Sequence, residues 1–329
     1  MKKKIAFITS ASGNVGDLVH AKGLEYILHQ VFPKDEYSYH RMIQWRNYYN
    51  YDFWRTDYDY ILLGGSPCLS PRFYEYYKYG VEIRRFFKWN KQAIKVLCGG
   101  GSNFSEDYTI EDVYKDKEFA SEVRKFYGDF DSLITRDHFA ENVFKEAGLS
   151  AHCLPCPSMF IFKQYKNVKL KEKRELPLII FGNPNAINPG LTTDKRKQEI
   201  IELQRNLAQR IKGFRPMAIS SRDVSVFSEK TLTMAHVGKV KIIKNSVIDL
   251  FDMMMRAEYV ISARVHSAIP ASLLGLMTYL IPFDTRKYCA EFFNIKTIYK
   301  AEDVKSYPFK EVNIDEYERQ YIKLLEGVR

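Results

Sequence analysis

Short apolar runs alternate with helix-patterned segments along nearly the whole chain, and this alternation limits the fold more than any other feature. Strand-forming runs are expected at residues 5–9, 60–63, 95–98, 131–135, 178–181, 217–220, 240–243, 259–261 and 276–281. Apolar residues at helical spacing and helix start and stop signals indicate helices at 17–32, 136–148, 193–212, 247–256, 268–274 and 315–325. Strands that alternate with helices are typical of parallel sheets. The sequence therefore predicts an α/β protein.

A charged segment divides this pattern into two similar halves. Residues 163–176 read KQYKNVKLKEKREL, which is nearly free of apolar periodicity, and Pro177 closes them. Each half opens with a strand, a loop and a helix, so both are expected to be Rossmann-like. We predict a first domain at 1–165, a linker at 166–177 and a second domain at 178–329 that includes the last helix. The two domains are expected to face a cleft.

The composition supports a folded chain with an anionic partner. Of its 329 residues, 46% are hydrophobic and 15% aromatic, which excludes a mainly disordered protein. The formal net charge of +10 favours a phosphorylated metabolite, an acidic glycan, a membrane surface or nucleic acid. Aromatic and arginine residues interleave between Tyr37 and Tyr60 as on some nucleic-acid surfaces, yet a partly buried loop or helix that carries amphipathic tyrosines explains them better. Nucleic acid is therefore not expected as a partner.

Neither a secretion signal nor a disulfide framework is expected. The first apolar run covers only Ile5–Ile8, and no stretch approaches the roughly 20 apolar residues of a transmembrane helix. Five cysteines are scattered along the chain, and Cys153 and Cys156 form a single C-x-x-C. Without a second pair or clustered histidines this motif is weak evidence for zinc, so two reduced thiols and no metal are expected. The resulting expectation is a cytoplasmic protein with at most peripheral membrane contact.

One βαβ unit, at residues 257–289, carries an arginine and a histidine between two apolar runs. Its strand at 259–261 precedes the helix at 268–274, with Ser267 expected as N-cap and Pro270 at the third helical position. Arg264 and His266 would then lie where open α/β sheets bind ligands and helix N-termini attract anions. A hydrogen-bonded structural histidine beside a solvated arginine explains the same pair about equally well.

Glycines follow three of the predicted strands. Gly13 and Gly16 precede the first helix, but the G-x-G-x-x-G spacing of dinucleotide-binding proteins is absent. Glycines at 64–65 and 99–101 follow the next two strands. Such glycines let the backbone approach a ligand or a packed helix, and the sequence does not distinguish the two.

Four short motifs, in this order, resemble those of the polysaccharide pyruvyl transferase family over about residues 5–290. They are Asn14-x-Gly16-Asp17, Arg136-Asp137 at a helix start, Ser262-x-Arg264-x-His266-Ser267, and Phe283-Asp284-x-x-Lys287. The third motif, with the aromatic-Asp pair and lysine downstream, is the most specific. Three features depart from the usual pattern: Ala140 replaces a serine, Cys156-Pro157 replaces Asp-Pro, and Asp284-Thr285-Arg286-Lys287 lacks a proline often found there.

The resemblance implies a GT-B-like fold and a cytoplasmic enzyme that transfers pyruvate from phosphoenolpyruvate to a sugar of a polysaccharide or glycan precursor. The product would be a pyruvate ketal, with phosphate released and no cofactor besides the donor substrate. The acceptor is expected to be free or lipid-linked, the latter at the inner face of the plasma membrane. His266 is the candidate proton carrier and Arg264 the candidate phosphate ligand. Further donor contacts are expected from Arg136, Lys287, Ser262 and Ser267, while Asn14, Gly16 and Asp17 would position the acceptor or the loop.

Two other functions fit the same pattern. A GT-B glycosyltransferase would hold the diphosphate of a nucleotide sugar at the same helix start. A non-catalytic protein that binds anionic glycans would use the basic charge and the aromatic segment. Two full domains joined by a hinge favour an enzyme over a binding module.

Overall fold

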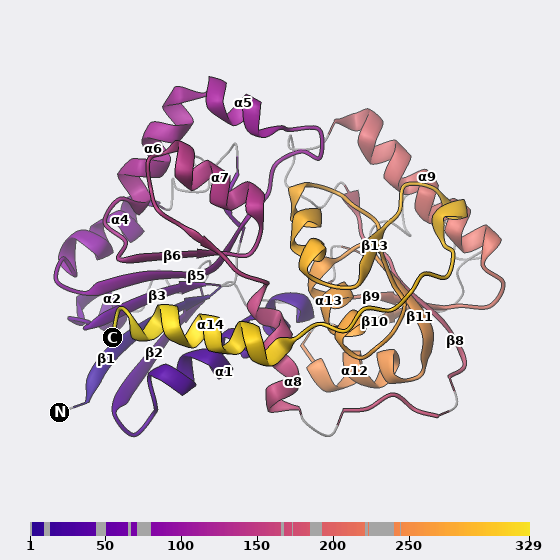
Figure 1. Cartoon of the computed structure of the whole chain (residues 1–329), viewed down its shortest axis with the longest axis horizontal. Helices are drawn as coiled ribbons and strands as arrows, with labels where there is room; N and C mark the ends of the chain where they lie inside the picture. Colours follow the sequence, from indigo (N-terminus) through magenta and orange to yellow (C-terminus); the bar gives the residue numbers. More distant parts are fainter. Residues whose placement is uncertain are drawn as a thin grey trace.

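Two parallel sheets, each with a hydrophobic layer on both faces, make up the protein (Figure 1). The computed structural model describes residues 2–9, 14–43, 51–64, 67–70, 80–165, 168–172, 174–184, 193–220, 223, 240–243 and 245–329. The prediction of an α/β protein with two Rossmann-like units is confirmed.

The first sheet has the strand order β2-β1-β3-β5-β6-β7, and β4 pairs with β5 beside this path. Because side chains alternate along a strand, Ile5 and Phe7 enter one hydrophobic layer while Ala6 and Ile8 enter the other. The strands are β1 (Lys3–Thr9), β2 (Tyr37–Ile43), β3 (Tyr60–Gly64), β4 (Pro67–Leu69), β5 (Ile94–Ser102), β6 (Ser132–Thr135) and β7 (His152–Cys153). The helices with them are α1 (Val15–Val31), α2 (Tyr51–Arg55), α4 (Gly80–Trp89), α5 (Ile110–Lys115), α6 (Lys117–Tyr127), α7 (His138–Glu146), η1 (Pro157–Phe160) and α8 (Ile161–Gln164).

The second sheet has the order β10-β9-β8-β11-β12-β13. Its strands are β8 (Leu176–Ile180), β9 (Arg215–Ala218), β10 (Lys241–Ile242), β11 (Ala257–Ser262), β12 (Thr278–Leu280) and β13 (Ile295–Thr297). The remaining helices are α9 (Asp194–Arg210), α12 (Val247–Met255), α13 (Val265–Leu273), η3 (Thr285–Phe292), η4 (Ala301–Asp303) and α14 (Ile314–Glu326). Central β11 lies between β8 and β12, so α13 begins at the middle of this sheet.

Helix α14 leaves the second half and packs on the first (Figure 1). Tyr321 and Leu325 are fully buried in the layer that also holds Leu28 and Phe160. The Tyr321 hydroxyl donates to the carbonyl of Pro155 over 2.8 Å. The predicted domain boundaries stay a prediction, but this helix belongs by its contacts to the first sheet, and β8 begins inside the predicted linker.

The start of α13 differs from the prediction. Its N-cap is Arg264, not Ser267, because Arg264 is extended (φ −136°, ψ 120°) and its carbonyl accepts from the Ala268 N–H at 3.0 Å. Pro270 is therefore the sixth helical residue, and its missing N–H leaves the His266 carbonyl without an intrahelical donor. His266 consequently sits in the first helical turn, where the helix dipole disfavours a positive charge.

Two other expectations need correction. Glycines 99–101 lie inside β5, not in a loop after it, and the register of β5 against β6 shifts between Cys98 and Gly100. Residues 37–43 of the aromatic segment form strand β2. Trp45, Tyr48 and Tyr49 lie outside the described residues, while Phe53 is buried in the core.

Across the described ranges, no helix is both long and apolar enough to cross a membrane.

Candidate functional site

The motif residues of the two halves meet where α1 and α13 approach each other. Gly16 in α1 lies so close to α13 that a Cβ on it would be 3.0 Å from the Cβ of His266. The Val15 N–H donates to the Ile219 carbonyl of the second domain over 3.4 Å, and Asn14 bridges to Ser220. The Asn14 side chain also accepts from Gly16 N–H at 2.9 Å. The N-x-G-D motif thus fixes α1 against the second domain.

Arg136 crosses from the first domain to His266. It is only 1% exposed, and its Nη1 lies 2.9 Å from His266 Nε2. A guanidinium can only donate, so this contact requires Nε2 to be an unprotonated acceptor. In the neutral ring the proton is then on Nδ1, which lies 3.8 Å from Oδ1 of Asp17.

Burial and three arginines set the charge of this pair. Burial lowers the pKa of His266 well below 6.5, and Arg136, Arg286 and Arg264 lower it further by repelling the imidazolium. Burial raises the pKa of Asp17 from 3.8 to about 7, although the same arginines oppose the rise. At neutral pH the site therefore holds a neutral histidine beside a carboxyl group that readily gains and loses a proton.

Arg136 and Arg264 are held by residues that sequence motifs alone did not connect. A Cβ on Gly101 would lie 2.3 Å from Nε of Arg136, so this glycine provides the space in which the arginine lies. Arg264 forms an ion pair with Asp223, which is fully buried. No sequence pattern distinguished Asp223.

The two serines of the S-x-R-x-H-S motif shape the turn around Arg264. Ser262 Oγ and Ser267 Oγ are 2.8 Å apart, and each donates to the Arg264 carbonyl at 2.9 Å. The Arg264 N–H donates to Ser262 Oγ at 3.0 Å. Both serines are fully buried. Their predicted contact with the donor stays a prediction, and their present bonds are to the turn itself.

Arg286, not Lys287, is the downstream cation that acts on His266 and Asp17. Asp284, which is 2% exposed, caps η3 and binds the guanidinium, with Nε of Arg286 at 2.7 Å. Lys287 instead contacts Glu106 of the first domain over 3.0 Å. Arg286 stands inside the recognised motif, but nothing in the sequence showed that it would face the histidine.

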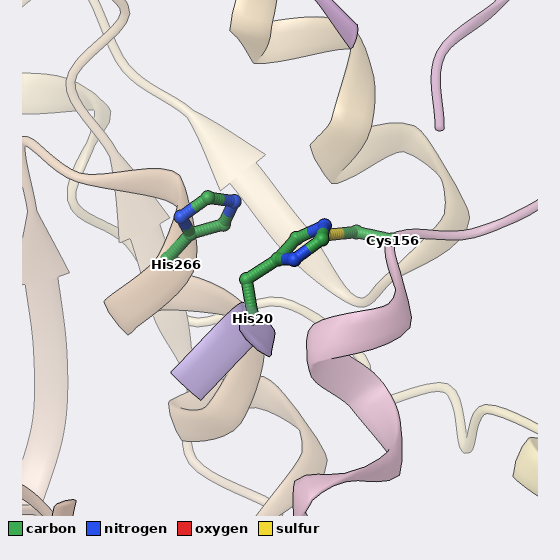
Figure 2. Close-up of side chains that lie close together, drawn as sticks. All are labelled: His20, Cys156 and His266. Carbon is green, nitrogen blue, oxygen red and sulfur yellow. The ribbon is translucent and has the colours of Figure 1, made fainter. Parts of the chain in front are cut away.

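His20 and Cys156 form a candidate metal-binding group with His266 (Figure 2). Their ligand atoms lie within 4.8 Å of one another, and His20 and Cys156 are fully buried. Cysteine and two histidines are a suitable donor set for zinc. However, Arg136 donates to Nε2 of His266. Burial lowers the pKa of both histidines, and Arg136, which lowers both further, also repels a divalent cation. The arrangement therefore suits an anion better than a metal, and the expected absence of metal stays a prediction.

Comparisons with known proteins agree with the fold and the motifs. A model of the polysaccharide pyruvyl transferase family matches residues 14–282. Among solved structures, a UDP-GlcNAc 2-epimerase from Methanocaldococcus jannaschii, in complex with UDP-GlcNAc and UDP, is similar at a TM-score of 0.55 and 14% identity, covering 99% of this chain and 100% of that one. S. aureus MnaA with UDP has a TM-score of 0.51 at 12% identity, covering 98% and 91%. Among curated proteins, no relative matches. At these identities the structural similarities concern the fold alone.

Proposed function

Because the chain belongs to the polysaccharide pyruvyl transferase family, we propose that it transfers pyruvate from phosphoenolpyruvate to a sugar of a polysaccharide or glycan precursor as a ketal. The observation that carries this proposal is the set of three arginines that act on one histidine and one carboxyl group. Phosphoenolpyruvate carries a carboxylate and a phosphate close together, so its site needs several fixed positive charges. Arg136, Arg264 and Arg286 supply them.

The proposed reaction balances without an added cofactor. Two sugar hydroxyls form C–O bonds to C2 of the donor, and the C–O bond to phosphate breaks. One hydroxyl proton ends on the former methylene carbon, which becomes the methyl group, and the other leaves with the phosphate. Protonation of the methylene carbon generates an oxocarbenium-like centre at C2, which a hydroxyl then attacks.

Proton transfer is assigned to Asp17 and His266. A carboxyl group with a pKa of about 7 is protonated often enough at neutral pH to act as an acid toward the methylene carbon. His266 is poorly suited to that step because its pKa is well below 6.5. As a base it would take the proton of an attacking hydroxyl at Nε2, where that hydroxyl replaces the N–H of Arg136 as donor. The arginines hold the donor and do not exchange protons.

The proposal is tested with purified protein, phosphoenolpyruvate and a panel of glycans, by measuring phosphate release and the mass gain of one pyruvate ketal. We expect His266→Gln to reduce kcat about a hundred- to ten-thousandfold, the usual contribution of a general base. His138→Gln is the control, because His138 is a largely exposed histidine of α7. Undiminished turnover in His266→Gln would remove the histidine from the mechanism.

A GT-B glycosyltransferase that uses a nucleotide sugar is the second candidate, since the epimerase from M. jannaschii, of similar fold, is described with UDP-GlcNAc and UDP. Thermal shift separates the two, because a ligand stabilises only the state that binds it. Phosphoenolpyruvate should raise the melting temperature and UDP should not. Stabilisation by UDP alone would favour the glycosyltransferase.

A further inference from the structure

A polar pocket of about 400 Å³ opens beside the arginine site. Both domains line it: Glu106 and Asp107 come from the first, and the rest from α9 and the segments around η3 and β13. The lining residues from the second domain are Thr193, Lys195, Arg196, Glu199, Lys287 and Tyr299. Its volume is in the range of pockets that bind small molecules. None of its lining residues takes part in the proposed proton transfers.

Lys287 lies between the pocket and the arginine site. Arg264, Arg286 and Lys287 line one small crevice, and Lys287 also lines the larger pocket. A ligand whose reacting end lay at the arginines could therefore extend past Lys287 into the pocket. That geometry fits an oligosaccharide, which is longer than the single sugar that reacts.

Ion pairs and hydrogen bonds join the walls of the pocket across the two domains. The side chain of Glu106 is 6% exposed, with Arg196 at 2.6 Å and Lys287 at 3.0 Å. Beside it, the N–H of Thr285 donates to the carbonyl of Phe104, and the N–H of Phe104 donates to Thr285 Oγ1, both over 3.0 Å. Side chains ordered in this way lose little entropy when a ligand binds.

The chemistry of the lining distinguishes it from the arginine site. Among the described lining residues, three acidic ones, Glu106, Asp107 and Glu199, balance three basic ones, so these residues carry no net charge that would select an anion. The carboxylates and amines of the lining can bond neighbouring sugar hydroxyls. Tyr299 adds an aromatic side chain that is 47% exposed and lies against Arg196 and Lys287. Aromatic rings offer apolar contact to the C–H face of a sugar.

We propose that this pocket is a glycan subsite, which binds a neutral sugar residue next to the one that reacts at His266. The inference rests on the proposed function for the reacting sugar. Donor and acceptor are then recognised at two places: the arginines bind the phosphorylated donor, and the charge-balanced pocket binds the acceptor chain.

The test combines a binding assay with steady-state kinetics. Wild type, Tyr299→Ala and Glu199→Gln are applied to an array of neutral oligosaccharides and uronate-containing counterparts, without phosphoenolpyruvate. Tyr114→Ala is the matched control, because Tyr114 is 44% exposed on α5 and does not line the pocket. We expect the wild type and the control to bind neutral glycans, and each pocket variant to bind about tenfold more weakly, as for loss of one good contact.

In kinetics with a bound glycan, the pocket variants should raise the KM for glycan about tenfold and leave the KM for phosphoenolpyruvate unchanged. Equal glycan affinity in the wild type and both pocket variants would overturn the subsite, even if phosphate is released. Preferential binding of uronates, or no glycan binding at all, would overturn it as well. If neutral glycans bind through Tyr299 but no phosphoenolpyruvate is consumed, the subsite stands and the proposed reaction falls.

Discussion

His266 and Asp17 depart from their usual pKa values in opposite directions for one shared reason. Burial disfavours the charged form of each group, which is the protonated form of histidine and the deprotonated form of aspartate. The arginines then lower both values. Their effect adds to burial at His266 and opposes it at Asp17. The pair is thus kept close to neutral beside three guanidinium groups, of which Arg264 is paired with Asp223 and Arg286 with Asp284. Such fixed donors suit an anionic substrate.

The raised pKa of Asp17 should be visible in how the free energy of unfolding depends on pH. The folded value of about 7 exceeds the ordinary 3.8, so the folded state binds more protons between these values and loses stability as pH rises through them. Asp17→Asn removes this loss. We expect the variant to gain about 1–4 kcal/mol over wild type between pH 4 and pH 8, measured by urea unfolding.

The free energy of unfolding of Asp17→Asn should be compared with that of wild type at each pH. His20 and His266 have lowered pKa values, and they reduce the stability of both proteins below pH 6.5. Asp129→Asn, which changes an exposed aspartate, is the control, and its free energy of unfolding should follow that of wild type across the pH range. A parallel curve for Asp17→Asn would show that Asp17 titrates normally.

Strand β5 determines where Arg136 can lie. The glycines at 99–101 were expected to end a strand beside a ligand or a helix, but they continue it and make space for side chains from the following segments. Gly99 has a φ of +69° and faces Pro157, and Gly101 faces Arg136. The glycines of β5 therefore shape the site indirectly, because they determine where Arg136 and Pro157 can pack.

Gly101→Ala should displace Arg136, because the new Cβ would lie 2.3 Å from its Nε and the arginine is buried. Loss of Arg136 beside His266 should raise the pKa of the histidine, which NMR titration measures, and reduce kcat/KM at least tenfold. Gly275→Ala is the control for general destabilisation, since Gly275 has a φ of +84° but lies outside the site residues. An unchanged pKa in Gly101→Ala would contradict the packing argument.

Local patterns predicted the elements better than they predicted the site. The apolar periods of β1, β3, α9 and α12 are local, and these elements form close to where they were expected. The start of α13 was misjudged because Ser267 is a common cap, whereas here the extended backbone of Arg264 begins the helix. The donor contact of Lys287, which the resemblance implies, stays a prediction, whereas its ion pair with Glu106, 181 positions away, had no local signal.

The two domains are joined twice. The chain passes to the second sheet before β8 and returns before α14, whose contacts with the first domain reach its far end. Tyr26 donates to Glu318 over 2.7 Å, and Tyr60 donates to the Arg329 carbonyl over 2.7 Å. The two crossings restrict how far the domains can separate around His266.

Variants of α14 should therefore weaken the first domain. Leu325→Ala, at a fully buried position, should cost about 2–5 kcal/mol. Tyr321→Phe should cost about 1–3 kcal/mol, because it leaves the Pro155 carbonyl without its donor. Urea unfolding measures both, and Tyr114→Phe on the surface should cost little. Hydrogen exchange should accelerate in β1 and α1 first; acceleration confined to β11 and β12 would contradict the assignment.

The position of α14 also has a consequence for protein synthesis. Tyr321 and Leu325 complete a layer begun by β1, yet the ribosome adds them after every strand of the second sheet. Domains generally fold in the order in which they are translated. Here the second sheet has its full set of strands while the first still exposes the apolar surface that α14 covers, so the first half to be translated is the last to finish folding.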